Sequence, residues 1–378
     1  MAERFDLAVV GAGIIGLATA LAGARRGLRV IVIDRDAQAN GASVRNFGFI
    51  VVSGQERTSM WARARRSREV WCEVAAAAGI AIVHRGLWLI VRRAESAEVL
   101  REYQATEMGT GSRLLAPAQA RERCPWLIAP QLCAVLESTV EVRIESRDAI
   151  PQLAAWLAGE HGVTFMRNTS VQRIEAPAVH TSRGLVHAER VAVCPGDDLS
   201  GLYAERLAAH ALTRCKLQML RLADPGLRLP AALMSDLSLG HYAGFAALPA
   251  ARALKALLAK EQPEHVRHGV HLIVVQSSDG SLVVGDSHQY AQTPDPFARE
   301  DVDRLILEEF RAALGIEPPP VIERWVGTYA SAAERSVLID APHPRVRVAI
   351  VTCGAGASIG FALGEELISS LTEDRSAG

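Results

Sequence analysis

The chain has 378 residues, which is long enough to bury a large core and predicts two domains. Charged residues make up 22% of it and hydrophobic residues 49%, as is ordinary for a soluble globular enzyme. A net charge of −1 gives no electrostatic reason to expect nucleic acid or an anionic membrane surface as a partner.

The six cysteines are scattered along the chain, with no CxxC motif and no histidine pair at zinc spacing. We therefore expect no metal site. Most of the cysteines are expected to be small buried residues of a protein in the reducing cytoplasm. They are Cys72, Cys124, Cys133, Cys194, Cys215 and Cys353.

The first motif runs from Leu7 to Arg35 and combines an apolar run, three glycines, a small-residue helix and a second apolar run. Gly11 permits a tight turn, Gly13 lets backbone N–H groups approach a pyrophosphate, and Gly16 lets the helix pack on the strand. Asp34 lies 18 residues beyond Gly16, where a carboxylate can accept both ribose hydroxyls. The order predicts dinucleotide binding, and the carboxylate argues against the 2′-phosphate of NADP.

The same segment has a membrane interpretation. Residues 7–24 are 18 residues without a charge, about the length of a span. Four glycines interrupt this stretch, a charged strand follows it, and no basic region or small-residue cleavage site is present. We therefore predict a βαβ unit and no membrane span.

The chain continues as alternating strands and helices, without repeats or low-complexity segments. In chain order we expect a helix at residues 56–79, a strand at 84–93, helices at 96–107 and 146–162, two strands joined by a turn within 163–175, a strand at 190–196, a hairpin through Asp279-Gly280 within 271–290, and a helix at 301–314.

The end of the chain resembles its beginning. Residues 346–371 predict a strand, a turn at Gly354, Gly356 and Gly360, and a helix. Such turns at both ends of a chain are unusual for a nicotinamide enzyme but suit FAD. The last helix then directs its N-terminus at the N1–C2 region of the flavin, where its dipole stabilises the negative charge of the reduced ring. A plain βα unit that closes the sheet is the alternative.

At this point the sequence resembles the superfamily of D-amino-acid oxidase, glycine oxidase and sarcosine oxidase, which are flavin-dependent amine oxidoreductases. The segments that carry the resemblance are VVGAGIIGLATA, GASVRNFGFI, VAVCPG, GSLVVGDSH and TCGAGASIGFALGEE. GASVRNFG also resembles a branch associated with bacterial aminophosphonate breakdown.

The resemblance implies a set of FAD-binding residues. It comprises Gly11, Gly13, Ile14, Ile15 and Gly16 at the pyrophosphate; Asp34 and Arg35 at the adenosine ribose; Ser43, Val44, Arg45, Asn46, Gly48 and Phe49 beside the flavin ring; Val171 at the adenine; Gly196 at the pyrophosphate; and Gly354, Gly356, Ala357, Ser358, Ile359 and Gly360 by the ribityl chain and N1.

Two positions depart from relatives. Relatives with covalent flavin use a His where this chain has Arg45, or a late Cys that the segment ERWVGTYAS lacks, so we expect non-covalent FAD. Some oxygen-using relatives have a Lys where this chain has Val283, which leaves oxygen or another electron acceptor open.

Amine oxidation needs a clamp for the substrate's anionic end, and the planar fork of an arginine suits a carboxylate or phosphonate. The resemblance points to Arg324, and Arg45 is the second candidate. His288 is the candidate catalytic residue, as a hydrogen-bond partner or proton acceptor. Tyr329 is a further candidate substrate contact. Ion pairing of the arginines and ordinary packing of His288 are the alternatives.

These observations predict an α/β protein with a glutathione-reductase-type, Rossmann-like FAD-binding domain (residues 1–83, 141–214 and 321–378). A mostly antiparallel α+β domain (residues 84–140 and 215–320) is expected to bind substrate. The predicted reaction is oxidation of a C–N bond in a small zwitterionic amine, with an aminoalkylphosphonate as the narrowest hypothesis. A glycine, sarcosine or D-amino acid substrate, or a hydroxy acid or phosphorylated alcohol, is the alternative.

Overall fold

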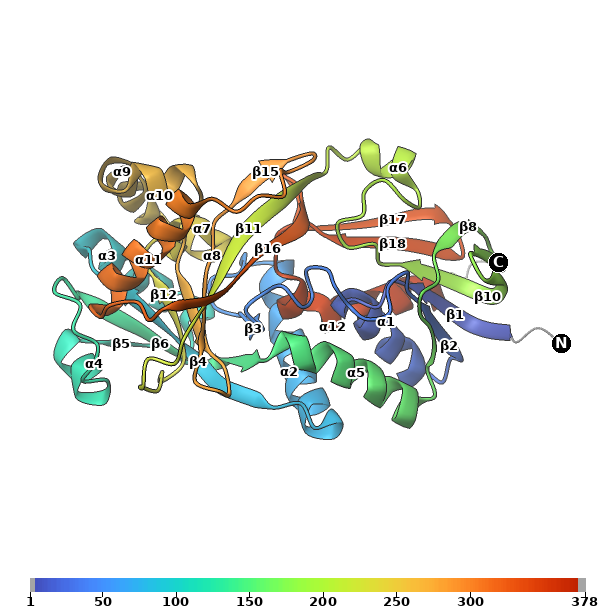
Figure 1. Ribbon diagram of the computed structural model, residues 1–378, viewed down its shortest axis with the longest axis horizontal. Helices are drawn as coiled ribbons and strands as arrows, with labels where there is room; N and C mark the ends of the chain where they lie inside the picture. Colours follow the sequence, from blue (N-terminus) through green and yellow to red (C-terminus); the bar gives the residue numbers. More distant parts are fainter. Residues whose placement is uncertain (1–3, 373–378) are drawn as a thin grey trace.

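Two β-sheets lie side by side along the long axis of the computed structural model, which describes residues 4–372 (Figure 1). Within these residues the first sheet has eight strands, and its main path runs β17-β18-β10-β1-β2-β7. Its strands are β1 (Arg4–Val10), β2 (Val30–Ile33), β7 (Thr164–Met166), β8 (Val171–Glu175), β9 (Ala178–Thr181), β10 (Gly184–Val193), β17 (Val337–His343) and β18 (Val346–Val351).

The centre of the first sheet is parallel, since β1 pairs in parallel with β10 and β2, and β10 with β18. Its strands are short apolar runs, and all four residues of β2 are buried. Such runs are expected where both faces of a parallel sheet are covered. The predicted Rossmann-like arrangement is confirmed.

The second sheet has ten strands within residues 4–372. They are β3 (Phe49–Ile50), β4 (Ile82–Val91), β5 (Arg113–Leu115), β6 (Ala134–Ile144), β11 (Thr213–Leu222), β12 (Ala232–Ser235), β13 (Ile273–Gln276), β14 (Leu282–Gly285), β15 (Gln289–Ala291) and β16 (Val321–Ser331). Neighbours pair in antiparallel fashion except β4 and β12, which are parallel. The second sheet is therefore mostly antiparallel, as predicted.

The helices cover these sheets (Figure 1). They are α1 (Ile14–Arg25), α2 (Ser59–Ala78), α3 (Ala94–Gln104), a 3-10 turn (Glu107–Gly109), α4 (Pro117–Arg123), α5 (Ser146–His161), α6 (Ala204–Ala208), α7 (Ser238–His241), α8 (Ala243–Ala246), α9 (Ala251–Glu261), α10 (Pro263–Arg267), α11 (Glu300–Leu314) and α12 (Gly356–Thr372). Of the helices within residues 4–372, none is both long enough and apolar enough to cross a membrane.

The centre of the second sheet is buried on both faces. Leu87 and Leu89 of β4 pack in one cluster with α3 and α9, whereas Trp88 and Ile90 pack in another with α4 and α11. This alternation follows from the period of two along a strand. It fixes the register of β4, because a slip of one residue would exchange the two clusters.

Three strands of the second sheet, β4, β6 and β11, run across limits of the residue ranges predicted from the sequence. β4 begins two residues before residue 84, β6 runs past residue 140, and β11 begins two residues before residue 215. β16 lies in the range assigned to FAD binding, yet it pairs with β11 along nearly its whole length. Strand pairing determines which sheet these residues join, and amino-acid composition does not reveal strand pairing.

Helix α12, from the last part of the chain, packs against α1 and α2, from the first part. A methyl group on Gly364 would lie 2.6 Å from the backbone carbon of Ala18 and 2.7 Å from the backbone nitrogen of Thr19. The helices therefore touch backbone to backbone.

We predict that Gly364→Ala destabilises the protein by about 1–3 kcal/mol, because the added methyl group overpacks the α1–α12 contact. Gly159→Ala is the matched control: this helical glycine of α5 has no atom within 4 Å of the added carbon. There, alanine should stabilise by up to about 1 kcal/mol through helix propensity. Thermal unfolding of the holoprotein compares the two, and equal melting temperatures would contradict the packing argument.

Candidate FAD and substrate site

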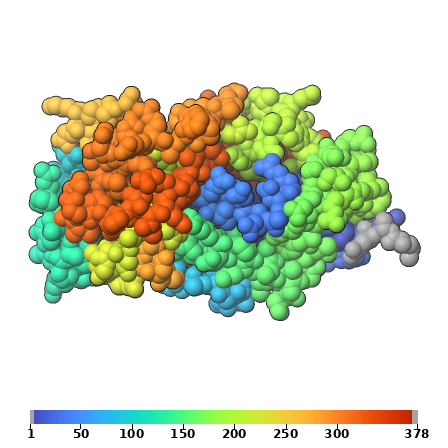
Figure 2. Space-filling model, viewed as in Figure 1, coloured from blue at the N-terminus to red at the C-terminus, as the bar shows by residue number. Residues whose placement is uncertain are grey.

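A cavity of about 660 Å³ is bordered by residues from both sheets. The turns that follow β1, β10 and β18 line it on the side of the first sheet, and β11, β13 and β16 contribute residues from the second. The space-filling view shows N-terminal residues, in blue, exposed between green and orange parts of the surface (Figure 2).

The turn from β1 into α1 forms one end of the cavity. Gly11 has a φ of +102°, and a Cβ there would lie 2.4 Å from the carbonyl oxygen of Cys194. A Cβ on Gly16 would lie 1.8 Å from the carbonyl oxygen of Gly11. No side chain caps the helix at Gly13, although the backbone N–H of Ile14 donates to Ser43 Oγ at 2.9 Å. This N-terminus fits an anionic pyrophosphate.

Asp34 stands at the end of β2, beside this turn. Its Oδ2 accepts the backbone N–H of Ala12 at 2.5 Å, and its Oδ1 accepts that of Asp36 at 2.8 Å. A carboxylate has about four lone-pair sites, so both oxygens can still accept ribose hydroxyls. The neighbouring Arg35 pairs with Asp198 at 3.0 Å. These residues fit the adenosine half of FAD.

The start of α12 forms a second wall. The backbone N–H of Val51 donates to Ser358 Oγ at 2.9 Å, and Trp71 Nε1 donates to the carbonyl oxygen of Ala357 at 2.8 Å. These bonds hold the N-terminus of α12 beside the segment that follows Arg45. A helix N-terminus here suits the negative charge of a reduced flavin.

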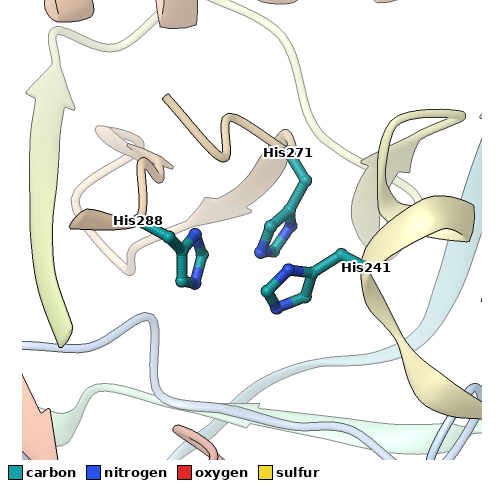
Figure 3. Close-up of side chains that lie close together, drawn as sticks. All are labelled: His241, His271 and His288. Carbon is teal, nitrogen blue, oxygen red and sulfur yellow. The ribbon is translucent and has the colours of Figure 1, made fainter. Parts of the chain in front are cut away.

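Three histidines gather at the other end of the cavity, one each from α7, the segment before β13 and the segment after β14 (Figure 3). The ring centroids of His241 and His271 are 4.0 Å apart, and those of His271 and His288 are 4.9 Å apart. Oδ1 of Asp286 lies 3.3 Å from His271 Nε2, and its Oδ2 lies 3.9 Å from His288 Nε2.

Burial determines the protonation state of the buried ionisable groups at this end of the cavity. Burial lowers the pKa of His288 to about 4 and the pKa of His271 well below its ordinary value. The adjacent imidazoles lower the pKa of His271 further. Burial also raises the pKa of Tyr329. Near neutral pH these imidazole rings and the phenol are uncharged.

Most of the predicted cofactor residues lie around this one cavity. They are Gly11, Gly13, Ile14, Ile15, Gly16, Asp34, Arg35, Ser43, Arg45, Asn46, Phe49, Val171, Gly196, Gly354, Gly356, Ala357 and Ser358. Of the predicted substrate contacts, Arg45, His288 and Tyr329 also line it. The structure thus brings the two glycine-rich turns together with three of the four candidate substrate residues.

Four predicted cofactor residues do not line the cavity. Val44 packs against the core of the first domain, and Ile359 is fully buried. Gly360 faces Ile14 and Ile15 across the helix contact. Gly48 bonds to the backbone of Ile144.

Arg324 is not among the cavity-lining residues. Its side chain is 55% exposed, and its Nε donates to Asp303 Oδ2 at 2.9 Å. Arg324 therefore forms an ion pair, which was the alternative to substrate binding considered for it. Arg45 instead borders the cavity, bonded through Nη1 to the carbonyl oxygen of Val326 and through Nη2 to Asn40 Oδ1.

His271, Asp286 and Tyr290 were not predicted as site residues, although all three line the cavity. Their positions in the sequence show no ligand spacing, because separate elements of the second domain bring them together. The run from Gly285 to His288 was the available signal, and it pointed to His288 alone.

Comparison with known proteins identifies the family. A family model described as FAD dependent oxidoreductase (DAO) matches residues 6–370. The curated glycine oxidase of Geobacillus kaustophilus (strain HTA426) is 26% identical over 224 residues, covering 56% of this chain. The match spans 58% of that relative, short of two thirds of its length.

Solved structures share the fold over nearly the whole chain. The glycine oxidase from Bacillus cereus ATCC 14579 has a TM-score of 0.78 at 17% identity, over 99% of this chain and 96% of that one. The L-proline dehydrogenase from P. horikoshii has a TM-score of 0.77 at 18% identity, over 100% and 96%. Identities this low establish the fold alone.

We predict that Asp34→Ala weakens FAD binding at least about tenfold, through loss of charge-assisted bonds contributing about 1.5–3 kcal/mol. Asp6→Ala is the control, since Asp6 accepts the backbone N–H of Arg29 away from the cavity. Titration of the apoprotein with FAD, followed by flavin fluorescence, gives both affinities. An unchanged affinity in Asp34→Ala would show that the carboxylate does not bind the ribose.

We expect FAD to be held without a covalent bond, because Arg45 replaces the histidine of covalent relatives. Acid precipitation should leave a colourless pellet and FAD in the supernatant. Cys353 and Cys194 line the cavity, so Cys353→Ala and Cys194→Ala identify the attachment if the pellet is yellow. A yellow wild-type pellet would contradict the prediction.

Proposed function

The chain belongs to the DAO family of FAD dependent oxidoreductases, and from this premise we propose that it oxidises the C–N bond of a small zwitterionic amine. The observation that carries the proposal is the continuity of the cavity. It runs from the dinucleotide turn at Gly11 to the polar end at His288 and Tyr329, so one space can hold both cofactor and substrate.

FAD, when bound, supplies the two-electron acceptor for a hydride from the carbon that bears nitrogen. The chain need supply no nucleophile. Its residues have to hold the amine beside the cofactor, fix the far end of the substrate and exclude water. The product is an imine, which water hydrolyses to an aldehyde and an amine.

We assign the anion-binding role to Arg45. It lines the cavity, and two hydrogen bonds hold its guanidinium while further N–H groups remain able to donate. The planar fork suits a carboxylate or a phosphonate. His288, with its uncharged ring, faces the same space.

We propose an aminoalkylphosphonate as the preferred substrate, such as 2-aminoethylphosphonate or its N-methylated or 1-hydroxylated form. This rests on the resemblance of GASVRNFG; of the two arginines considered, Arg45 lines the cavity and Arg324 pairs with Asp303. Oxidation of glycine, sarcosine or a D-amino acid is the alternative that fits the glycine oxidase relative.

The electron acceptor that reoxidises the flavin is oxygen or another compound. Val283, where some oxygen-using relatives have a Lys, is buried in an apolar cluster. The cytoplasmic location stays a prediction, which six free cysteines fit.

The substrate class is tested by anaerobic mixing of the holoenzyme with a panel of glycine, sarcosine, D-amino acids, aminophosphonates and hydroxy acids. We predict loss of the oxidised flavin's visible absorbance with amines, and fastest with an aminophosphonate. Faster reduction by glycine or a D-amino acid would overturn the phosphonate proposal alone. Reduction only by hydroxy acids or phosphorylated alcohols would overturn amine oxidation as well.

We expect Arg45→Gln to raise KM more than it lowers kcat if the clamp acts in both the ground and transition states. The loss in kcat/KM should be about 2–5 kcal/mol for a desolvated anion, and an amine lacking the anionic group should lose little. Arg324→Gln is the matched control, because that guanidinium pairs with Asp303 outside the cavity. Equal losses in both variants would contradict the assignment to Arg45.

A further inference from the structure

We propose that His241, His271 and His288 form a binding site for a divalent transition-metal ion of the zinc class, with Asp286 as the adjacent carboxylate. One ring nitrogen from each histidine lies within 4.8 Å of the other two. The three side chains come from separate segments and point toward one another (Figure 3). Imidazole nitrogens suit zinc, copper, iron and nickel.

The hydrogen bonding of His288 fits a metal ligand. Its Nδ1 lies 2.9 Å from the carbonyl oxygen of Gly269, so Nδ1 donates its hydrogen and Nε2 keeps its lone pair. Metal-binding histidines generally anchor their second nitrogen in this way, to a backbone carbonyl or a carboxylate. The ring is thus held in the tautomer that a metal requires.

Unsatisfied polar atoms in the same cluster are a second, independent observation. His271 Nδ1 and Asp286 Oδ1 are buried and have no hydrogen-bond partner among residues 4–372, because the 3.3 Å approach of Oδ1 to His271 Nε2 does not have hydrogen-bond geometry. Such atoms are uncommon in folded proteins and generally have a role. Here both belong to a group of three imidazoles and a carboxylate, which is a donor set for a metal.

The surroundings of Asp286 also fit a metal site. Asp286 is buried, and the side chains at ion-pair distance from it within residues 4–372 are His271 and His288, not a lysine or an arginine. Buried carboxylates are generally paired or coordinate a metal. A divalent ion bound by the three rings would lie beside this carboxylate.

The site remains open toward the cavity. His271 and His288 are buried, whereas His241 is exposed at the end of α7 and lines the cavity. Ring nitrogens around a tetrahedral zinc lie about 3.3 Å apart, so binding would draw the rings together by no more than about 1.5 Å. Three protein ligands leave a position for water or substrate. If Nε2 of His288 binds a metal, its lone pair cannot accept a proton. His288 would then act as a metal ligand and not as the proton acceptor predicted from the sequence.

The test is a calorimetric titration of the chelator-treated holoenzyme with Zn²⁺ alone. We expect one Zn²⁺ per chain, and binding at least about tenfold weaker in each of His241→Gln, His271→Gln, His288→Gln and Asp286→Asn. His265→Gln is the matched control, because this buried histidine lies outside the cavity, with its Nε2 3.1 Å from the carbonyl oxygen of Leu305. It should bind Zn²⁺ as the wild type does.

Flavin content and thermal unfolding show whether each variant folds. If the variants of the buried residues do not fold, His241→Gln, at an exposed position, is sufficient for the test. The readout is metal binding, so its failure does not affect the proposed amine oxidation. Absence of saturable binding, or equal affinity in the wild type and His241→Gln, would overturn the metal site. Equal weakening in His265→Gln would also overturn it, since the effect would then not depend on the three histidines.

Discussion

The contact between α1 and α12 is the constraint on which the rest of the site depends. Because Gly364 has no side chain to hold the helices apart, the backbone of α12 packs against that of Ala18 and Thr19. The N-termini of two helices from opposite ends of the chain therefore lie along one cavity. The first N–H groups of a helix have no partner within it, and each N-terminus carries partial positive charge. Together they suit a cofactor with a pyrophosphate at one end and a redox-active ring at the other.

The two sheets divide the work of the site. The parallel sheet ends in the turns that fit the dinucleotide, whereas the mostly antiparallel sheet contributes the polar end with its histidines and tyrosines. The segment around Arg45 connects them: Trp325 Nε1 of β16 donates to the carbonyl oxygen of Arg45 at 3.1 Å, and Val51 bonds to Ser358 of α12. Substrate chemistry can thus vary on the second sheet without disturbing the cofactor turns.

Local patterns were sufficient to predict the glycine-rich turns after β1 and β18. Gly16 and Asp34 contact Gly11 and Ala12 within a single βαβ unit, so their spacing in the sequence carries their arrangement in space. The hairpin through Asp279-Gly280 was predictable for the same reason, and it joins β13 to β14. Residues whose neighbours are close in sequence are those that a pattern can place.

The substrate end was harder to predict because its residues meet only after the second sheet has formed. Arg324 lies on β16, where its half-exposed guanidinium pairs with Asp303 of α11, a partner distant in the sequence from the cofactor motifs. His241, His271 and His288 are separated by loops and helices, and only tertiary structure places their rings within contact. Nor did the sequence indicate that β16 joins the second sheet, since pairing with β11 decides this.

A crystal structure of the flavin-loaded protein tests the central claim most directly, namely that one cavity holds cofactor and substrate between the two sheets. We predict density for FAD with its pyrophosphate at the N-terminus of α1, its ribose at Asp34 and its flavin ring between the start of α12 and the three histidines. Density for the flavin ring outside this cavity, or on the far side of the sheet from the histidines, would contradict the account.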